Sequence, residues 1–214
     1  MTWILLVASY LIGAIPSSYL GGRIARGIDL RQFGSGNLGA TNAFRVLGWK
    51  VALPVLVFDI LKGFLPTFLF PMWDGAGPDA AGVLGGGWAY AYGAAAILGH
   101  VFSPYVAFKG GKGVATSAGM LIALAPWGLL AGFLTWLTLV FTTRIVSISS
   151  IVAAIVVPVV VAIVYGIGPV FWVCVGVAAF VIFAHRSNLR RLMRGEEARF
   201  GRKAGETPGP GVNP

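Results

Sequence analysis

The stretch "SISSIVAAIVVPVVVAIVY", residues 147–165, contains no charged side chain. A helix that crosses the hydrocarbon core of a bilayer needs about 20 mainly apolar residues, so this stretch predicts a transmembrane helix. The composition of the whole chain agrees, because 57% of its 214 residues are hydrophobic and only 11% are charged. A water-soluble protein needs more polar surface than this. We therefore expect an all-α integral membrane protein.

Six more apolar stretches are candidate transmembrane helices: 2–22, 51–72, 88–108, 114–125, 127–143 and 169–185. The first stretch lacks the basic region and the cleavage site of a signal peptide, so we expect it to remain as the first span. The stretches 114–125 and 127–143 meet at Ala125-Pro126. They could form a hairpin of two helices or one distorted element, and the sequence leaves both alternatives open.

The distribution of charge predicts how the chain crosses the membrane. Basic residues gather in four segments: 23–50, 109–112, Arg144 and 186–203. The connection 73–87 instead holds Asp74 and Asp79 and no basic residue. Because basic loops favour the cytoplasm, we expect a polytopic bundle of about seven transmembrane helices, with the N-terminus outside and the C-terminus cytoplasmic. A single crossing over 114–143 would place Arg144 outside.

We expect one transmembrane domain over residues 1–200, since the sequence shows no repeat and no second soluble domain. Residues 201–214 are rich in Gly and Pro, which predicts a disordered cytoplasmic tail. The chain has 16 Lys and Arg against 7 Asp and Glu. In a soluble domain this excess would suggest a nucleic-acid partner. In a membrane protein it more often sets the orientation and attracts anionic head groups, so we expect no nucleic acid.

Polar residues and glycines gather in three segments on the predicted cytoplasmic side: 33–45, 99–113 and 184–197. The first, "FGSGNLGATNAFR", combines three glycines with Ser35, Asn37, Thr41 and Arg45. Ser, Asn and Gly favour turns and helix N-termini, where unpaired N–H groups can bind an anion. The alternative is an N-capped turn that only leads into the second span.

The second segment ends in "FKGGKG", in which Gly110, Gly111 and Gly113 surround Lys112. Glycine lets backbone N–H groups approach a bound group closely, and lysine favours an anion, so the pattern predicts a phosphate site. It is not a Walker loop, since Val106 and Gly113 occupy positions that would need Gly and Ser or Thr. For His100 a packed, hydrogen-bonded role is favoured over catalysis.

The third segment places His185, Asn188 and Arg191 at helical spacing, so they could share one face where the last span leaves the membrane. The alternative is a basic amphipathic end that binds lipid head groups. A weaker fourth site is "TRIVSISS", with Ser150 in the first turns of the sixth span.

Several catalytic patterns are absent from the sequence. Tyr105 and Arg190 stand five residues after the two histidines, so there is no H-x-x-x-x-D pair, and there is no metal-ligand cluster or G-x-S-x-G elbow. The predicted cytoplasmic carboxylates all lie outside the two glycine-rich segments 33–45 and 99–113: Asp29, Glu196, Glu197 and Glu206. Such a site suits anion binding better than nucleophilic attack. Within the second span, Asp59 and Lys62 are expected to form a structural ion pair, with a proton relay as the rival role.

Three motifs, "SGNLGATNAFR", "GHVFSPYVAFKGGKGVAT" and "HRSNLRRLMRGEE", closely resemble, in this order, the signature motifs of the bacterial acyl-phosphate:glycerol-3-phosphate acyltransferases. The resemblance covers residues 2 to about 200 and includes "LKG" and "SISS". One position departs from it: in "RIVSISS" an isoleucine follows the arginine, where an aromatic residue is expected. It implies transfer of a fatty acyl group from acyl phosphate to the sn-1 hydroxyl of glycerol 3-phosphate, giving lysophosphatidic acid and phosphate. It also implies a bacterial cell membrane location with a cytoplasmic active site, no cofactor or metal, and a functional link to the enzyme that makes acyl phosphate.

By the same resemblance, the phosphate of glycerol 3-phosphate is expected near these residues: Ser35, Arg45, Lys112, His185 and Asn188, with the backbone of Gly110, Gly111 and Gly113. Asn37, Thr41 and Ser150 are expected at the glycerol or the acyl-phosphate head. Arg45, Lys112 and His185 are the catalytic candidates. Either a substrate oxygen or His185 could take the proton from the attacking hydroxyl.

Two other functions fit the residues less well. A transporter for a small phosphorylated anion would place its binding groups near the bilayer midplane, reachable from both sides. A structural membrane subunit would leave the polar residues of the first and third segments without a purpose. Because all three segments fall on one predicted side of the membrane, an enzyme that uses cytoplasmic substrates is favoured.

Overall fold

The computed structural model describes residues 1–74 and 87–199. The predicted tail and most of the acidic connection 73–87 lie outside these residues. Ten α-helices follow one another in the described chain: α1 (Thr2–Ala14), α2 (Ser17–Arg26), α3 (Ala40–Leu47), α4 (Trp49–Trp73), α5 (Gly87–Val101), α6 (Val114–Leu124), α7 (Pro126–Thr143), α8 (Val146–Tyr165), α9 (Pro169–Ala184) and α10 (Arg186–Met193). Two 3-10 turns, η1 (Leu30–Gln32) and η3 (Pro104–Val106), complete the list, and these residues contain no strand. The all-α expectation is confirmed.

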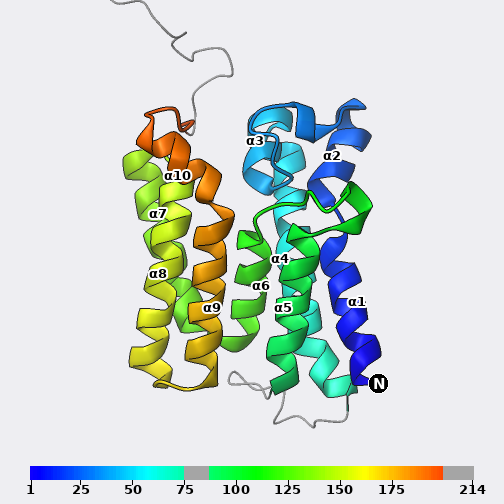
Figure 1. Ribbon diagram of the computed structural model, residues 1–214, viewed down its shortest axis with the longest axis vertical. Helices are drawn as coiled ribbons and strands as arrows, with labels where there is room; N and C mark the ends of the chain where they lie inside the picture. Colours follow the sequence, from blue (N-terminus) through cyan, green and yellow to red (C-terminus); the bar gives the residue numbers. More distant parts are fainter. Residues whose placement is uncertain (75–86, 200–214) are drawn as a thin grey trace, which may run out of the picture.

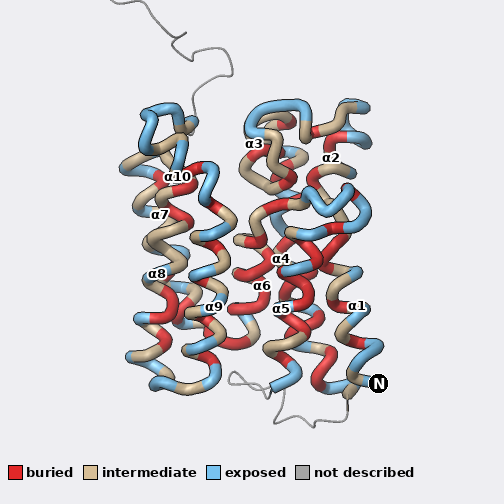
Figure 2. Tube along the Cα trace, in the orientation of Figure 1, coloured by how far each residue is buried: buried red, intermediate tan, exposed pale blue. Residues whose placement is uncertain are grey.

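The long helices form two packed groups that run along the long axis of the molecule (Figure 1). In one group α8 packs between α7 and α9. In the other, α5 packs against α1 and α4, and α4 also packs along α6. The short helix α6 contacts α7 and α9 as well, so it joins the two groups. Figure 2 shows that buried residues concentrate along α6 and the helices beside it.

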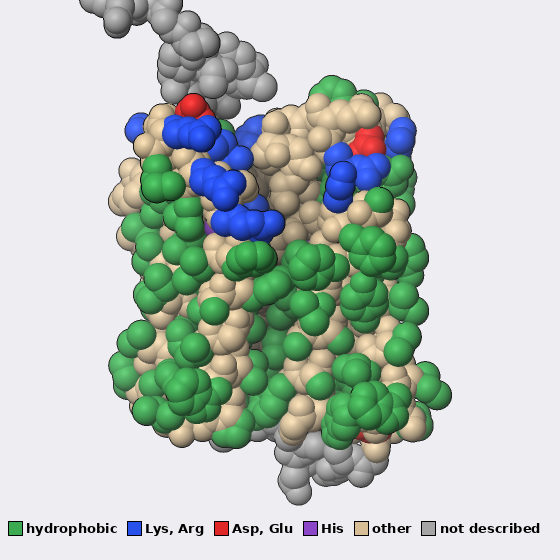
Figure 3. All heavy atoms as spheres, viewed as in Figure 1, with side chains coloured by type: hydrophobic (Ala, Val, Ile, Leu, Met, Phe, Trp, Pro, Cys, Tyr) green, Lys and Arg blue, Asp and Glu red, His purple; other side chains and the backbone are tan. Residues whose placement is uncertain are grey.

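The outer faces of the helices are apolar. Trp3, Phe141 and Ile163 are 72%, 75% and 78% exposed, and each lies on a different helix. Figure 3 shows that apolar side chains dominate the visible surface, except at the upper end of Figure 1, which carries α2, α3 and α10. Such a surface would be unfavourable in water and is suited to contact with lipid tails. Together with the helix composition, it agrees with an integral membrane protein.

Four helical segments are long and apolar enough to span a bilayer: Thr2–Arg26, Trp49–Trp73, Pro126–Thr143 and Val146–Tyr165. The bent pair of α9 and α10 would make a fifth. Each of the seven predicted stretches does contain a helix, but α5 and α6 are shorter than this test requires. The total of seven crossings and the orientation therefore stay predictions. The stretch 114–143 is two helices separated at Ala125, which favours the hairpin alternative.

Two predicted spans differ from the structure because of proline. The stretch 88–108 is helical only as far as Val101, after which Pro104 begins a separate 3-10 turn. The stretch 2–22 is broken at Ile15, which adopts extended backbone (φ −55, ψ 117) before Pro16. A proline ring disfavours helical backbone at the preceding residue, so both breaks have a local cause. The break after Val101 leaves a long loop, 102–113, at the upper end of the molecule.

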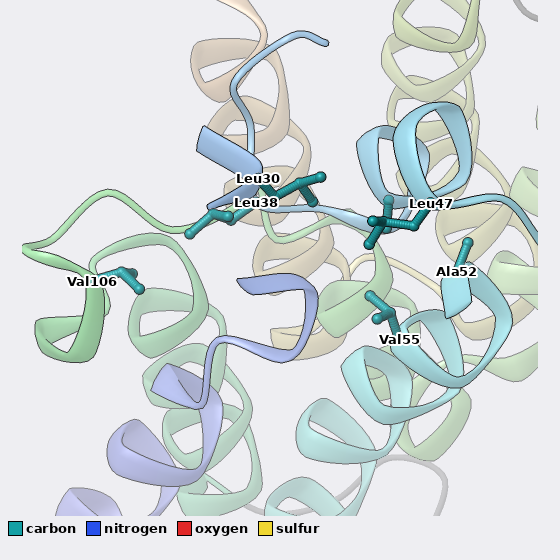
Figure 4. Close-up of a cluster of buried hydrophobic side chains, with 7 residues drawn as sticks. Leu30, Leu38, Leu47, Ala52, Val55 and Val106 are labelled. Carbon is teal, nitrogen blue, oxygen red and sulfur yellow. The ribbon is translucent and has the colours of Figure 1, made fainter. Parts of the chain in front are cut away.

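A cluster of buried side chains holds the upper end together (Figure 4): Leu30, Leu38, Leu47, Ala52, Val55, Val106 and Ala43. Leu30 and Leu38 flank the glycine-rich turn of the first polar segment, and Val106 belongs to the loop 102–113. Leu30 is fully buried. Because both segments pack into one core, the first polar segment and the loop 102–113 are fixed relative to each other.

Candidate active site

A pocket with a volume of about 520 Å³ opens at the upper end, between the two helix groups. Residues from three segments line it, among them Ser35, Gly36, Asn37, Phe108, Lys109, Gly110, Gly111, Lys112, Phe180, Phe183, Arg186, Arg190 and Arg191. A second pocket of about 430 Å³ shares four lining residues with the first, so the two form one groove. In Figure 3 basic side chains stand on both sides of the hollow at this end. The groove thus combines cations with a wall of phenylalanines.

The turn of the first polar segment is shaped by Gly34 and Gly36, which have φ of +61° and +69°. Asn42, which is buried on α3, holds this turn from below. Its Oδ1 accepts a hydrogen bond from the N–H of Ser35 at 2.9 Å, and its Nδ2 donates to the carbonyl of Phe33 at 3.1 Å. These bonds fix the backbone of Ser35 at the pocket wall. The role of Asn42 is therefore structural, and it was outside the predicted site.

The glycine loop, residues 109–113, lies against the end of α5. The N–H of Gly110 donates to the carbonyl of Val101 at 3.0 Å, and the N–H of Gly111 donates to the carbonyl of His100 at 3.1 Å. A Cβ atom at either glycine would collide with His100. The glycines are thus required for close approach to α5. We expected these two N–H groups to face a ligand, but in the structure they donate to backbone carbonyls of α5.

The N-terminus of α6 follows the loop directly. Gly113 is the N-cap in left-handed backbone (φ +78°). Among the described residues no side chain caps this end, so its first N–H groups are left for another acceptor. Since these N–H groups and the helix dipole both favour negative charge, the end of α6 supports anion binding where Gly110 and Gly111 do not.

Lys112 is the first donor of a hydrogen-bond network that crosses the groove to α10. Its Nζ donates to Oδ1 of Asn188, whose Nδ2 donates to Glu197 Oε1 at 2.5 Å. Ser147 on α8 donates to the same carboxylate oxygen at 2.8 Å, and Arg191 donates to Oε2 at 2.8 Å. A bend of 53° between α9 and α10 brings Asn188 to this place. The second and third polar segments therefore meet in space, as expected.

Glu197 is a residue that sequence analysis left outside the site. The turn that ends α10 at Gly195 (φ +70°) folds the chain back, so Glu197 reaches three hydrogen-bond donors. Burial acts to raise the pKa of this carboxyl, but the bonds from Asn188, Arg191 and Ser147 lower it more. Glu197 is therefore ionised. The signal in the sequence was the glycine that makes the return turn possible.

Burial lowers the pKa of Lys112 to about 8, against the opposing effect of the Glu197 charge. The charges of Arg191 and Arg45 act in the same direction as burial. Lys112, in the second polar segment, therefore interacts electrostatically with charged residues of the first and third segments. A cation that is partly desolvated beside other cations gains when an anion binds, which is the behaviour expected of a phosphate site.

The other candidates lie at varying distance from the groove. Ser35, Asn37, Gly110, Gly111 and Lys112 line the pocket, and Asn188 contacts Lys112. Thr41, Arg45, Gly113, Ser150 and His185 lie outside its lining. Ser150 accepts a bond from Trp136 at 3.2 Å and donates to the carbonyl of Val146 at 2.9 Å, whereas Ser147 of the same helix donates to Glu197.

His185 is buried at the bend between α9 and α10. Its Nδ1 lies 2.8 Å from the carbonyl oxygen of Val181. Because a carbonyl can only accept, Nδ1 carries the proton and Nε2 of the neutral ring has a free lone pair. In the two described ranges, no group of three or more His, Cys, Asp or Glu side chains is placed to hold a metal ion.

Comparison with known proteins agrees with the resemblance of the motifs. The chain matches the family model of glycerol-3-phosphate acyltransferase over residues 3–195. The glycerol-3-phosphate acyltransferase of Staphylococcus saprophyticus is 44% identical, over 92% of this chain and 96% of the relative. That of Chlorobium phaeobacteroides is 40% identical, over 92% and 97%. The crystal structure of PlsY (YgiH), an integral membrane glycerol 3-phosphate acyltransferase in its glycerol 3-phosphate form, superposes with a TM-score of 0.80. It is 36% identical and covers 94% of this chain and 96% of PlsY. The chain therefore belongs to the glycerol-3-phosphate acyltransferase family.

Proposed function

We propose that the acyl donor is a long-chain acyl phosphate and that the products are 1-acyl-glycerol 3-phosphate (lysophosphatidic acid) and phosphate. The observation that carries this is the position of Lys112, between an uncapped helix N-terminus and a groove with a phenylalanine wall. Such a groove suits two substrates that both bear phosphate, one of which also bears an apolar chain. The PlsY structures in glycerol 3-phosphate and lysophosphatidic acid forms support the same substrate and product for this chain.

The proposed reaction needs alignment more than a protein nucleophile. The sn-1 oxygen of glycerol 3-phosphate attacks the acyl carbonyl carbon, forming the ester C–O bond. The C–O bond to the phosphate breaks, and phosphate leaves with the electron pair. Holding the two anions together supplies most of the rate, since the donor is already activated. The hydroxyl proton goes to an oxygen of the departing phosphate; Nε2 of His185 is the rival acceptor.

Two of the proposed ligands, Lys112 and Asn188, belong to the network described above, and the others follow from the resemblance of the motifs. Ser35, Arg45, Lys112, His185 and Asn188 would bind the phosphate of glycerol 3-phosphate, together with the N–H groups at the start of α6. Asn37, Thr41 and Ser150 would lie nearer the glycerol or the donor head. Among these, Arg45, Lys112 and His185 are proposed as the catalytic residues. The acyl chain would follow the side of the groove that Phe180 and Phe183 line.

The proposed location is the bacterial cell membrane, inner or plasma, with the groove on the cytoplasmic side. The basic side chains at the upper end support this, because positive loops favour the cytoplasm (Figure 3). A cytoplasmic groove would receive glycerol 3-phosphate directly, and acyl phosphate from the enzyme that produces it. A functional link to that enzyme is part of the proposal.

The donor is tested with detergent-purified protein, glycerol 3-phosphate and either palmitoyl phosphate or palmitoyl-CoA. We expect phosphate and lysophosphatidic acid in equal amounts from palmitoyl phosphate, only when glycerol 3-phosphate is present, and no acylation from palmitoyl-CoA. Product from palmitoyl-CoA alone would contradict the proposed donor. If folded protein forms neither product but carries labelled glycerol 3-phosphate into vesicles, the transporter alternative replaces this proposal.

A pH dependence follows from Lys112, whose pKa is about 8 in the free enzyme. Lysine is charged below its pKa, so kcat/KM for glycerol 3-phosphate is expected to be on a plateau below this pH and to fall as pH rises through it. A bound phosphate favours the charged form, so the fall in kcat is expected at higher pH than the fall in kcat/KM. Initial rates across the pH range check both limbs. Equal pKa values for the two limbs would argue that Lys112 does not touch the phosphate.

A further inference from the structure

A cluster of ionisable side chains is buried below the glycine loop, outside the groove. Asp59 and Lys62 of α4 are 1% and 2% exposed, and their Oδ1 and Nζ atoms are 2.8 Å apart. The expected ion pair is thus confirmed. His100, at the end of α5, joins it with Nδ1 at 3.6 Å from the same Asp59 oxygen. We call Asp59, Lys62 and His100 the buried charge cluster.

The buried charge cluster ties the broken first helix to the rest of the upper end. Lys62 Nζ donates to the carbonyl of Ile15 at 3.0 Å, where α1 ends. Ser17, in the first turn of α2, donates to Asp59 Oδ1 at 2.6 Å. The cluster therefore contacts both sides of the helix break, and it joins four helices at one point: α1, α2, α4 and α5.

His100 connects the cluster to the glycine loop. Its carbonyl accepts the N–H of Gly111, and its imidazole ring occupies the space that a side chain at Gly111 would need. The position of the loop backbone thus depends on the position of His100. Lys112 follows Gly111 directly, so a shift of the ring would be passed to the lysine that faces the groove.

The energetics of the cluster argue for positioning rather than for stability alone. Burial of an ion pair costs desolvation that apolar residues of similar size would avoid. Within the described residues, Asp59 Oδ2 and His100 Nδ1 also have no hydrogen-bond partner. Such an arrangement is a costly way to join two helices. The cost is explained if the ion pair is needed to hold the His100 ring in one orientation.

We propose that His100, oriented by the Asp59–Lys62 pair, is a positioning residue that sets the glycine loop and Lys112 for binding glycerol 3-phosphate. This inference rests on the proposed function of Lys112 as a phosphate ligand. It differs from a proton relay, because no proton has to move. It also differs from a purely structural pair, because loss of His100 would change substrate binding in protein that remains folded.

The test compares His100→Ala, His100→Asn, Asp59→Asn and Lys112→Ala in detergent. We expect His100→Ala to raise KM for glycerol 3-phosphate by about 10- to 100-fold, the range for loss of the bond between a displaced Lys112 and the phosphate, with a smaller change in KM for palmitoyl phosphate. His100→Asn should recover part of this loss, since its amide can occupy the place of Nδ1. Thr67→Ala is the matched control, because Thr67 is a buried polar residue further along α4. It should leave both KM values unchanged.

Amide hydrogen exchange over residues 108–113 provides a second measurement. We expect faster exchange of this segment in His100→Ala and Asp59→Asn, and unchanged exchange in α8. If Asp59→Asn fails to fold, the two His100 variants still decide. Unchanged KM and exchange in folded His100→Ala would overturn the inference. If Lys112→Ala also leaves KM for glycerol 3-phosphate unchanged, the proposed role of Lys112 as a phosphate ligand is wrong as well. If Lys112→Ala raises this KM while His100→Ala does not, only the positioning role of His100 is wrong.

Discussion

Replacement of Lys112 by alanine is expected to lower kcat/KM for glycerol 3-phosphate by about 100-fold or more, with little change in the melting temperature. The change removes a partly buried cation and leaves a bound phosphate with one charged partner fewer, which typically costs 2–5 kcal/mol. It also frees Asn188, whose Oδ1 accepts from Lys112 in the unliganded network. Steady-state rates with palmitoyl phosphate and a melting curve measure both effects.

The matched control for this experiment is Lys109→Ala, in the same loop. Lys109 is exposed at the rim of the groove, so its charge is screened by solvent. Its loss should change kcat/KM by only a few-fold. Lys112→Arg should not restore full activity, because a planar guanidinium cannot replace a compact ammonium at Asn188 without displacing it. Equal effects of Lys109→Ala and Lys112→Ala would mean that the loop attracts substrate by charge alone.

The apolar helices were predictable from the sequence because most of their limits are local, whereas the short polar helices α2, α3 and α10 were not predicted as separate helices. Apolar runs mark the helices, and Pro126 and Pro169 stand at the first turn of α7 and α9, where a missing N–H costs nothing. The early end of α5 has an equally local cause in Pro104, yet the apolar residues after it concealed the end of the helix. Hydropathy alone does not separate a helix from an apolar loop.

The site could be predicted only in part, because its groups are joined by contacts between distant segments. Lys112 and Asn188 were expected at the site, and their hydrogen bond joins the loop to α10. The place of Glu197 could not be predicted, since it depends on donors from α8 and α10 that meet only in the folded chain. For the same reason, the pattern of glycines indicated close approach of the backbone but not its partner, which is α5.

The second large effect is expected for Gly110→Ala, because Gly110 lies against the backbone of α5. An added methyl group would collide with the carbonyl oxygen of His100 and lie 2.8 Å from that of Val101. Both are backbone atoms, so the loop itself has to move and the bond from the Gly110 N–H to Val101 is strained. A misplacement of about 1 Å can cost 10²-fold in rate, and we expect a loss of about this size in kcat/KM.

Gly176→Ala is the control that separates this effect from a general intolerance of glycine substitution. Gly176 lies within α9, and a Cβ atom there would meet nothing within 4 Å. Alanine is favoured over glycine in a helix by about 1 kcal/mol, so activity should be unchanged and the melting temperature equal or higher. If Gly110→Ala keeps full activity, the loop adapts without displacing Lys112, and the close contact with α5 serves packing only. Loss of activity in Gly110→Ala with an intact fold would place the cause in the position of the loop, because the substitution removes no charge and no polar side chain.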